Sequence, residues 1–159
     1  MSEKRAKMLP NDLEAEQSLL GCLFISQDAC IEVFPSLAAK DFYSNAHQKI
    51  YQAMLDNYKK NVAVDYITVS KVLEVKSELE EVGGLGYLTD LTNYVPSAAN
   101  YKHYADIIKN DSILRQIIEA SQSTINDAFD QADASNVLAK AEKLIFDIGQ
   151  TKSRSSLEH

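Results

Sequence analysis

The amino-acid sequence predicts an all-α fold, with a globular helical head over residues 9–100 and an antiparallel helical hairpin over residues 101–150. Three observations lead to this prediction. The 159 residues include only five glycines and three prolines, so few residues interrupt helices. Apolar side chains recur at helical spacing along most of the chain. Residues that favour helix N-termini precede several of these stretches.

The first helix is predicted to begin after Asn11, in the stretch LPNDLEAEQSLLGCLF. Glu14 follows Asn11 by three residues, which is the spacing of a capping box. From Leu19 to Ile25 the helix is apolar on every side, and such a helix is normally enclosed by other helices. Gly21 costs about 1 kcal/mol of helix propensity relative to alanine. We therefore expect a close crossing with another helix at Gly21.

Two further helices are predicted before residue 61. The stretch from Asp28 to Leu37 is typical of a short helix that Pro35 ends. Ser44 or Asn45 is then predicted to cap a longer helix. The apolar face of this helix contains Ile50, Met54, Leu55 and Tyr58, and its last turn carries Lys59 and Lys60, where the helix dipole favours positive charge.

The remainder of the head is predicted to contain two more helices. A few residues typical of strands precede Thr68, which is predicted to cap a helix with Val69, Val72 and Leu73 on one face. The glycines of the stretch EEVGGLGYLTDLTNYVP predict a turn. The helix after this turn is expected to run to about Tyr94 and to end before Pro96.

The pattern changes after residue 100, where residues 101–129 contain neither glycine nor proline. They predict one helix of roughly 40 Å. Ser135 is predicted to cap a second helix that ends at Gly149, and the short polar loop between the two helices predicts an antiparallel hairpin. The apolar stripe around Ile117, Leu144 and Ile148 has too few partners within the pair, which predicts self-association.

The two ends of the chain differ in character from the body. Residues 1–8 are polar and of mixed charge, as expected of a flexible arm. Residues 151–159 are interpreted as the start of an interdomain linker followed by SSLEH, which is similar to a vector-derived scar. We therefore expect the chain to be a piece of a longer protein.

Composition argues against several classes of function. The net charge is −7, whereas strong nucleic-acid binding needs clustered lysine and arginine, so at most weak binding is expected. No run of about 18 apolar residues and no signal peptide occurs, so we expect no membrane span and a cytoplasmic location. Cys22 and Cys30 lie in apolar stretches without a CxxC pair, which favours buried thiols in a reducing compartment.

Motifs for catalysis are also missing from the sequence. No glycine is followed by lysine, which excludes a Walker A phosphate loop. The stretch GGLGYL lacks the glycine spacing and the parallel-sheet context of a dinucleotide site. His47 and His103 are the only histidines of the body, too few for a metal site, and His47 is interpreted as a capping or core-edge residue. We expect no enzyme activity, cofactor or metal in this chain.

Three stretches together resemble the N-terminal domain of DnaB-type replicative DNA helicases. The stretch LPNDLEAEQSLLGCLF is similar to the family opening P-x-x-x-E-A-E-Q-x-x-L-G. A second block is DFYSNAHQKIYQAM with VDYITVSKVL, and a third is LEEVGGLGYLTDLTNYVPSAANYKHYADII. The resemblance extends in order over residues 9 to about 150. It implies a non-catalytic collar domain, all-α, with a globular head of about six helices followed by a C-terminal antiparallel helical hairpin. ATP and magnesium would belong to a C-terminal ATPase domain, which we expect to lie outside this chain.

The resemblance also implies partners. In the helicase hexamer these domains form a trimer of dimers, and they bind the C-terminal helicase-binding domain of primase. A helicase loader is a further partner known to act on this family. By position in the motifs, the resemblance assigns primase contact to Glu14, Tyr87, Ile118 and Ile125. Alternatives stay open at this point: a capping role for Glu14, core packing for Tyr87, and hairpin packing for the two isoleucines.

Two other functions fit parts of the sequence. One is a free-standing helical adaptor of a phage or plasmid that imitates this helicase domain and regulates the helicase. It would lack an ATPase domain downstream in its gene. The other is a small helical enzyme built on His47 or His103, for which replacement of both histidines should abolish an activity without unfolding the protein.

Overall fold

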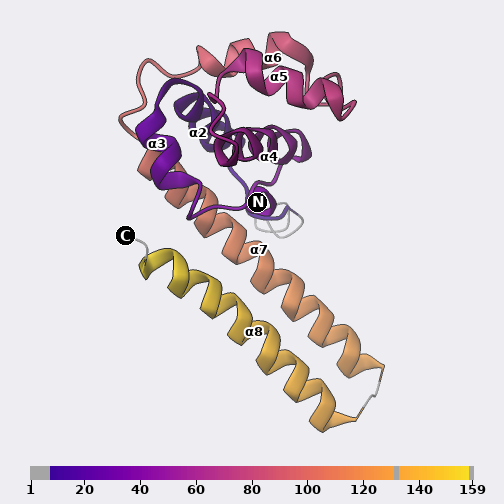
Figure 1. Ribbon diagram of the computed structural model, residues 1–159. Coiled ribbons are helices and arrows are strands. Elements are labelled where there is room, and N and C mark those ends of the chain that lie inside the picture. The colour runs from indigo at the N-terminus through magenta and orange to yellow at the C-terminus, as the bar shows by residue number, and fades with distance from the viewer. Residues whose placement is uncertain (1–7, 131–132, 158–159) are drawn as a thin grey trace. The chain divides into compact units, whose positions relative to one another are not determined.

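The computed structural model describes residues 8–130 and 133–157, with side chains as far as Lys152, and it confirms the all-α prediction (Figure 1). Among these residues there is no strand. The elements are α2 (Leu13–Ile25), α3 (Gln27–Val33), the 3-10 helix η1 (Ala39–Asp41), α4 (Asn45–Lys59), α5 (Tyr66–Val75), α6 (Gly84–Thr92), α7 (Tyr101–Phe129) and α8 (Ala134–Leu157). The predicted arm at residues 1–8 falls almost entirely outside the described residues.

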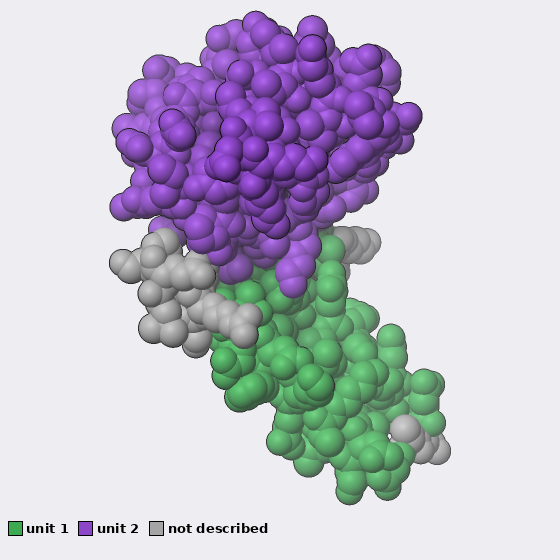
Figure 2. Space-filling model, in the orientation of Figure 1, with its two compact units in different colours: residues 1–10, 110–159 green, residues 11–109 purple. Residues whose placement is uncertain are grey.

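The chain divides into two compact units, which Figure 2 colours separately. The head comprises residues 11–109, and the hairpin unit comprises residues 110–159 with residues 1–10. The start of α7 therefore belongs to the head, although the sequence suggested a head that ends at residue 100. Two contacts explain the difference. Ile108 is buried in the head core, and the Lys109 ammonium lies 3.5 Å from the buried carboxylate of Asp41.

Helix α2 lies at the centre of the head. It packs against α3, α4 and α6, and Leu19, Leu20 and Leu23 are fully buried between them. The close crossing predicted at Gly21 is confirmed, because a Cβ atom at this position would lie 2.6 Å from the carbonyl oxygen of Leu91 in α6. The apolar circumference of α2 is thus explained by the helices that surround it.

Two helix N-caps of the head differ from the predicted residues. Asp12, not Asn11, caps α2 and accepts a hydrogen bond from the Ala15 amide at 3.0 Å, so Glu14 does not close a capping box. Asp65, not Thr68, caps α5. The Thr68 amide donates to Asp65 at 2.8 Å and the Asp65 amide donates to the Thr68 hydroxyl at 3.2 Å, which makes Thr68 the third helical residue. In both cases an aspartate side chain accepts a hydrogen bond from a free amide of the first turn.

The limits of the last helix also differ from the prediction. Asp133 precedes α8 and accepts a hydrogen bond from the Asn136 amide at 3.3 Å, whereas Ser135, the predicted cap, lies within the helix. The helix continues through Gly149 to Leu157. A single exposed glycine lowers helix stability by only about 1 kcal/mol, which the residues on either side outweigh.

Within the hairpin unit, α8 lies alongside α7 (Figure 1). The half-buried positions of α8 recur every three or four residues, at Val137, Ala141, Leu144, Ile148 and Thr151. Between residues 115 and 129 of α7, the buried and half-buried residues are small or polar, including Ala120 and Thr124. The Asp127 carboxylate forms an ion pair with Lys140 of α8 at 2.8 Å. The seam between the helices is therefore narrow, and most large apolar side chains of α7 lie outside it.

Candidate functional site

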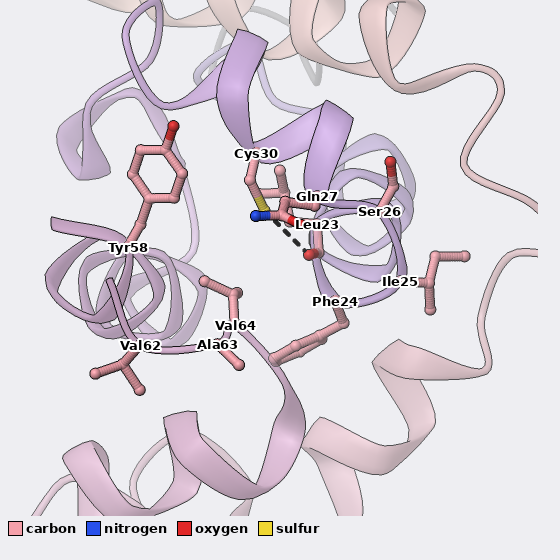
Figure 3. A pocket seen from close by; sticks show the side chains of 10 residues that line it. All are labelled: Leu23, Phe24, Ile25, Ser26, Gln27, Cys30, Tyr58, Val62, Ala63 and Val64. Carbon is pink, nitrogen blue, oxygen red and sulfur yellow. Dashed lines mark hydrogen bonds between the residues drawn. The ribbon is translucent and has the colours of Figure 1, made fainter. Parts of the chain in front are cut away.

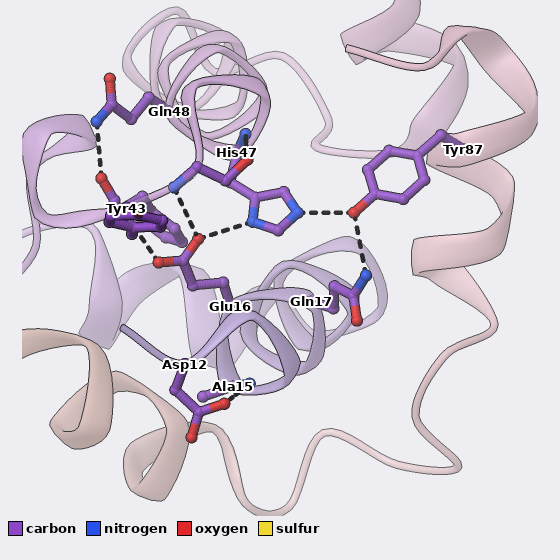
Figure 4. A network of polar contacts seen from close by, with 10 residues as sticks. Asp12, Ala15, Glu16, Gln17, Tyr43, His47, Gln48 and Tyr87 are labelled. Atoms are coloured by element: carbon purple, nitrogen blue, oxygen red, sulfur yellow. Dashed lines mark hydrogen bonds and ion pairs between the residues drawn. The ribbon is translucent and has the colours of Figure 1, made fainter. Parts of the chain in front are cut away.

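A buried polar network connects three helices of the head (Figure 4). Its centre is Glu16 of α2, whose side chain is 2% exposed. The carboxylate accepts hydrogen bonds from the backbone amides of Tyr43 at 2.7 Å and Ser44 at 3.3 Å, and from Nδ1 of His47 at 2.8 Å. A buried carboxylate is tolerable only with several such donors. Glu16 therefore fixes the N-terminus of α4 against α2.

His47 extends the network from α4 to α6. Because Nδ1 faces a carboxylate, it carries a proton, and Nε2 lies 2.7 Å from the Tyr87 hydroxyl. In the neutral ring the Tyr87 hydroxyl donates to Nε2, and the same hydroxyl accepts from Nε2 of Gln17 at 3.3 Å. The rings of His47 and Tyr87 lie in nearly parallel planes, 5° apart. Both nitrogens of His47 are thus used within the head, which agrees with a structural histidine.

Tyr87 is half-buried, and its surroundings affect the phenol. Burial raises the pKa of Tyr87 above its ordinary value, and the hydrogen bond from Gln17 opposes this effect. Gly83 precedes α6 with φ of +111°, and a Cβ atom at Gly83 would lie 2.8 Å from Cβ of Tyr87. The glycine pair of the GGLGYL stretch therefore provides a left-handed turn and the space that the tyrosine occupies.

Glu16 and Gln17 were not among the predicted site residues. An acidic residue near a helix N-terminus is ordinarily explained by the helix dipole, so Glu16 gave no separate signal in the sequence. The available signal was that Glu16, His47 and Tyr87 belong to three different motif blocks. Spacing within one helix cannot indicate that such residues meet in space.

The four residues assigned to primase contact lie in both units. Glu14 is exposed in the first turn of α2, one turn before Gln17, and Tyr87 is half-buried beside Gln17. Both belong to the head. Ile118 and Ile125 belong to the hairpin unit, where they are 38% and 50% exposed. The exposure of Glu14 and the two isoleucines makes them available to a partner, whereas the Tyr87 hydroxyl already has two partners within the head.

The three residues predicted to mediate self-association differ in exposure. Ile117 is 39% exposed on α7, while Leu144 and Ile148 are half-buried in the seam of the hairpin. Other large apolar side chains of α8 are more exposed than these two, namely Leu138, Ile145 and Phe146. An outward apolar face therefore exists, but it is centred on different residues of α8 from those that the spacing suggested.

The head also contains a small cavity of about 270 Å³ between the end of α2, the start of α3 and residues 58–64 (Figure 3). Its lining includes Phe24, Val64 and Cys30. The Cys30 thiol donates to the carbonyl oxygen of Leu23 at 3.3 Å, and burial raises the pKa of the thiol to about 11. Leu23 lies in the last turn of α2, so the thiol pairs one of the carbonyl groups that a helix end leaves free.

Among the described residues, no group of three or more His, Cys, Asp and Glu side chains is placed to hold a metal ion. No described helix combines the length and apolar character needed to cross a bilayer.

Comparisons with known proteins agree on one family. The family model described as DnaB-like helicase N terminal domain matches residues 8–110. The replicative DNA helicase DnaC of Bacillus subtilis is 39% identical over 154 residues, and DnaB of Geobacillus stearothermophilus is 36% identical over 161 residues. These matches cover 96% and 100% of this chain, but only 34% and 36% of the relatives. The chain thus spans about a third of their length.

Solved structures agree with this assignment. The N-terminal domain of DnaB helicase from Mycobacterium tuberculosis superposes with a TM-score of 0.83 and 37% identity, over 88% of this chain and 99% of that one. A DnaB-like replicative helicase, described together with its interactions with primase, superposes with a TM-score of 0.74 over 88% of this chain and 31% of that one. At 24% identity, this second similarity shows a shared fold.

Proposed function

Because the chain belongs to the family of DnaB-like helicase N-terminal domains, we propose that it is the non-catalytic collar domain of a cytoplasmic replicative helicase, which assembles with its own copies and recruits primase. The ATP and magnesium chemistry of the helicase then belongs to a separate domain. Binding is the mechanism of this module, since it holds primase near the replication fork at high local concentration.

The observation that supports self-association most directly is the outward apolar surface of the hairpin unit. Phe129, Leu138 and Phe146 are 82%, 61% and 62% exposed, and Ile125 and Ile145 are also at least half exposed. The seam between α7 and α8 meanwhile contains small and polar residues of α7. Large apolar residues on the outside of a helix pair are typical of surfaces that another subunit covers. A second copy of the hairpin offers a matching apolar surface.

Sedimentation of the purified domain tests this proposal. We expect wild-type protein to sediment as a dimer or larger assembly at micromolar concentration. Phe146→Glu should shift it towards monomer, because a charge would be buried without a partner. The control is Glu142→Gln, an exposed change on the same helix. Monomeric wild-type protein at all accessible concentrations would contradict the proposal.

Support for primase binding comes from family membership and from the exposure of the assigned residues. Glu14 offers a carboxylate at the helix start, and Ile118 and Ile125 offer apolar area on α7. The net charge of −7 fits a protein partner with basic groups better than single-stranded DNA. A helicase loader is a further candidate partner, and we propose at most weak contact with nucleic acid.

Binding to the C-terminal helicase-binding domain of primase tests this part. Glu14→Gln and Ile118→Asp should each weaken binding several-fold, since both change exposed side chains. Matched controls are Glu74→Gln on α5 and Ser121→Asp on α7, which introduce the same residues, glutamine and aspartate, at other exposed positions. If all four variants bind primase as the wild type does, these residues do not form the contact.

A further inference from the structure

Hydrogen bonds between side chains join α2, α4 and α6 in the polar network of the head. Glu16 and Gln17 come from α2, His47 from α4 and Tyr87 from α6. Glu16 and His47 are 2% and 5% exposed, so neither side chain is available to a partner. The Tyr87 hydroxyl contacts His47 at 2.7 Å and Gln17 at 3.3 Å. The Glu16 carboxylate, both ring nitrogens of His47 and the Tyr87 hydroxyl therefore each have a partner inside the head.

Helix α6 packs against α2 and α5, but its N-terminus has no side-chain cap. It is only nine residues long, and its N-cap is Gly83, which provides no side-chain hydrogen bond. Short helices are marginal without tertiary contacts. On its buried side, Leu88 and Leu91 enter the core, and Leu91 approaches Gly21. Apolar contacts of this kind oppose separation of the helices, but a directional hydrogen bond also opposes sliding and rotation.

We propose that Glu16, Gln17 and His47 are positioning residues, which hold the Tyr87 hydroxyl and thereby fix α6 and its exposed surface relative to α2. This inference rests on the proposed function, because it assigns Tyr87 an indirect role in primase binding. Tyr87 orients α6, which exposes Leu85 and Asp90, and the Tyr87 hydroxyl contacts Gln17 of α2, about one turn after the exposed Glu14. A partner that contacts both helices recognises the arrangement that the network maintains.

Two substitutions remove the same hydrogen bond from opposite sides. Tyr87→Phe keeps the ring and deletes the hydroxyl. His47→Asn places an amide nitrogen near the position of Nδ1, so it keeps a donor for Glu16, but it has no atom that reaches Tyr87. Both variants, and the double variant, are compared with Thr68→Ala. This control removes a capping contact of α5 and thus a similar amount of stability at a site outside the network.

Two measurements are made on each variant. The first is hydrogen exchange of the amides of residues 84–92. We expect exchange about tenfold faster in both single variants and unchanged in Thr68→Ala. The second is the dissociation constant for the primase C-terminal fragment. We expect about five- to tenfold weaker binding for each single variant. The double variant should show no further loss beyond Tyr87→Phe, since the hydrogen bond between His47 and Tyr87 is already absent there.

The outcomes separate this inference from the proposed function. If Tyr87→Phe weakens primase binding while His47→Asn binds as the wild type does, the hydroxyl contacts primase directly and the positioning role is wrong. If exchange within α6 is unchanged in both variants, the network does not fix the helix and the inference also fails. If the wild-type domain does not bind primase at all, the proposed function fails, and the exchange measurement still decides whether the network positions α6.

Discussion

At Gly21, α2 approaches the backbone of α6 closely. Replacement by alanine would place a methyl group 2.6 Å from the Leu91 carbonyl oxygen, which is backbone and cannot rotate away. We expect Gly21→Ala to lower the free energy of unfolding by about 1–3 kcal/mol, despite the better helix propensity of alanine. Gly86→Ala in α6 is the control, because its Cβ atom would have no neighbour within 4 Å. Urea denaturation measures both, and equal stability of the two variants would contradict the close approach.

The buried thiols predict a loss of stability at alkaline pH. Burial raises the pKa of Cys22 and of Cys30 from 9.0 to about 11. The folded state therefore keeps the thiol proton to higher pH than the unfolded state, so the stabilisation is complete below pH 9 and is lost as the pH rises from 9 to 11. The loss amounts to about 2–3 kcal/mol for each thiol.

Cys30→Ser tests this effect at one position. Serine keeps a donor for the Leu23 carbonyl oxygen but does not ionise in this range. We expect the free energy of unfolding to fall less steeply between pH 9 and 11 in Cys30→Ser than in the wild type. Equal slopes, measured by denaturant titration at several pH values, would show that Cys30 ionises alike in both states.

At the scale of single elements, α5 depends on its capping box. Its sequence contains several β-branched residues, which lowers the intrinsic stability of a helix. Asp65→Ala removes the acceptor for the Thr68 amide and should cost about 1 kcal/mol, whereas Asp65→Asn keeps an acceptor and should cost less. Thermal unfolding followed by circular dichroism measures the difference. If the alanine and asparagine variants have the same melting temperature as the wild type, the cap does not stabilise α5.

The same elements show how far the sequence predicts the fold. The apolar spacing of residues 101–129 and their lack of glycine and proline predict α7 with its observed limits. Ser44, one of the two residues predicted to cap α4, is its N-cap, and both signals are local. The predicted caps lie one to three residues from the observed caps Asp12, Asp65 and Asp133. Neighbouring polar residues compete for the same amides, and the sequence does not decide between them. Gly149 predicts a helix end, but at this exposed position a glycine lowers the stability of the helix only slightly.

The candidate site was less predictable than the helices. The motif blocks assigned primase contact to Tyr87, which stays a prediction, but they did not indicate its hydrogen bonds. The contacts between His47 and Glu16 and between His47 and Tyr87 join residues 31 and 40 positions apart. No periodicity extends over such separations. Likewise, the spacing of Leu144 and Ile148 showed that they share a face, while their half-buried state depends on α7.

At the scale of the whole molecule, the exposed apolar surface of the hairpin unit predicts that thermal stability depends on protein concentration. Association that occurs only in the folded state raises the melting temperature as concentration increases. We expect a measurable rise between about 1 and 100 µM for the wild type, and no rise for Phe146→Glu. Calorimetry at several concentrations tests this. If the melting temperatures of the wild type and of Phe146→Glu depend on concentration in the same way, Phe146 is not part of the association surface.

The buried pairing of Glu16 with His47 has an evolutionary consequence. A carboxylate in this position is acceptable only while the imidazole and two backbone amides face it, so replacement of one side chain makes the other unfavourable. Homologous sequences should therefore change the two positions together, and an apolar residue in place of Glu16 should be accompanied by loss of the histidine. An alignment in which the two positions vary independently would indicate that the pairing is dispensable.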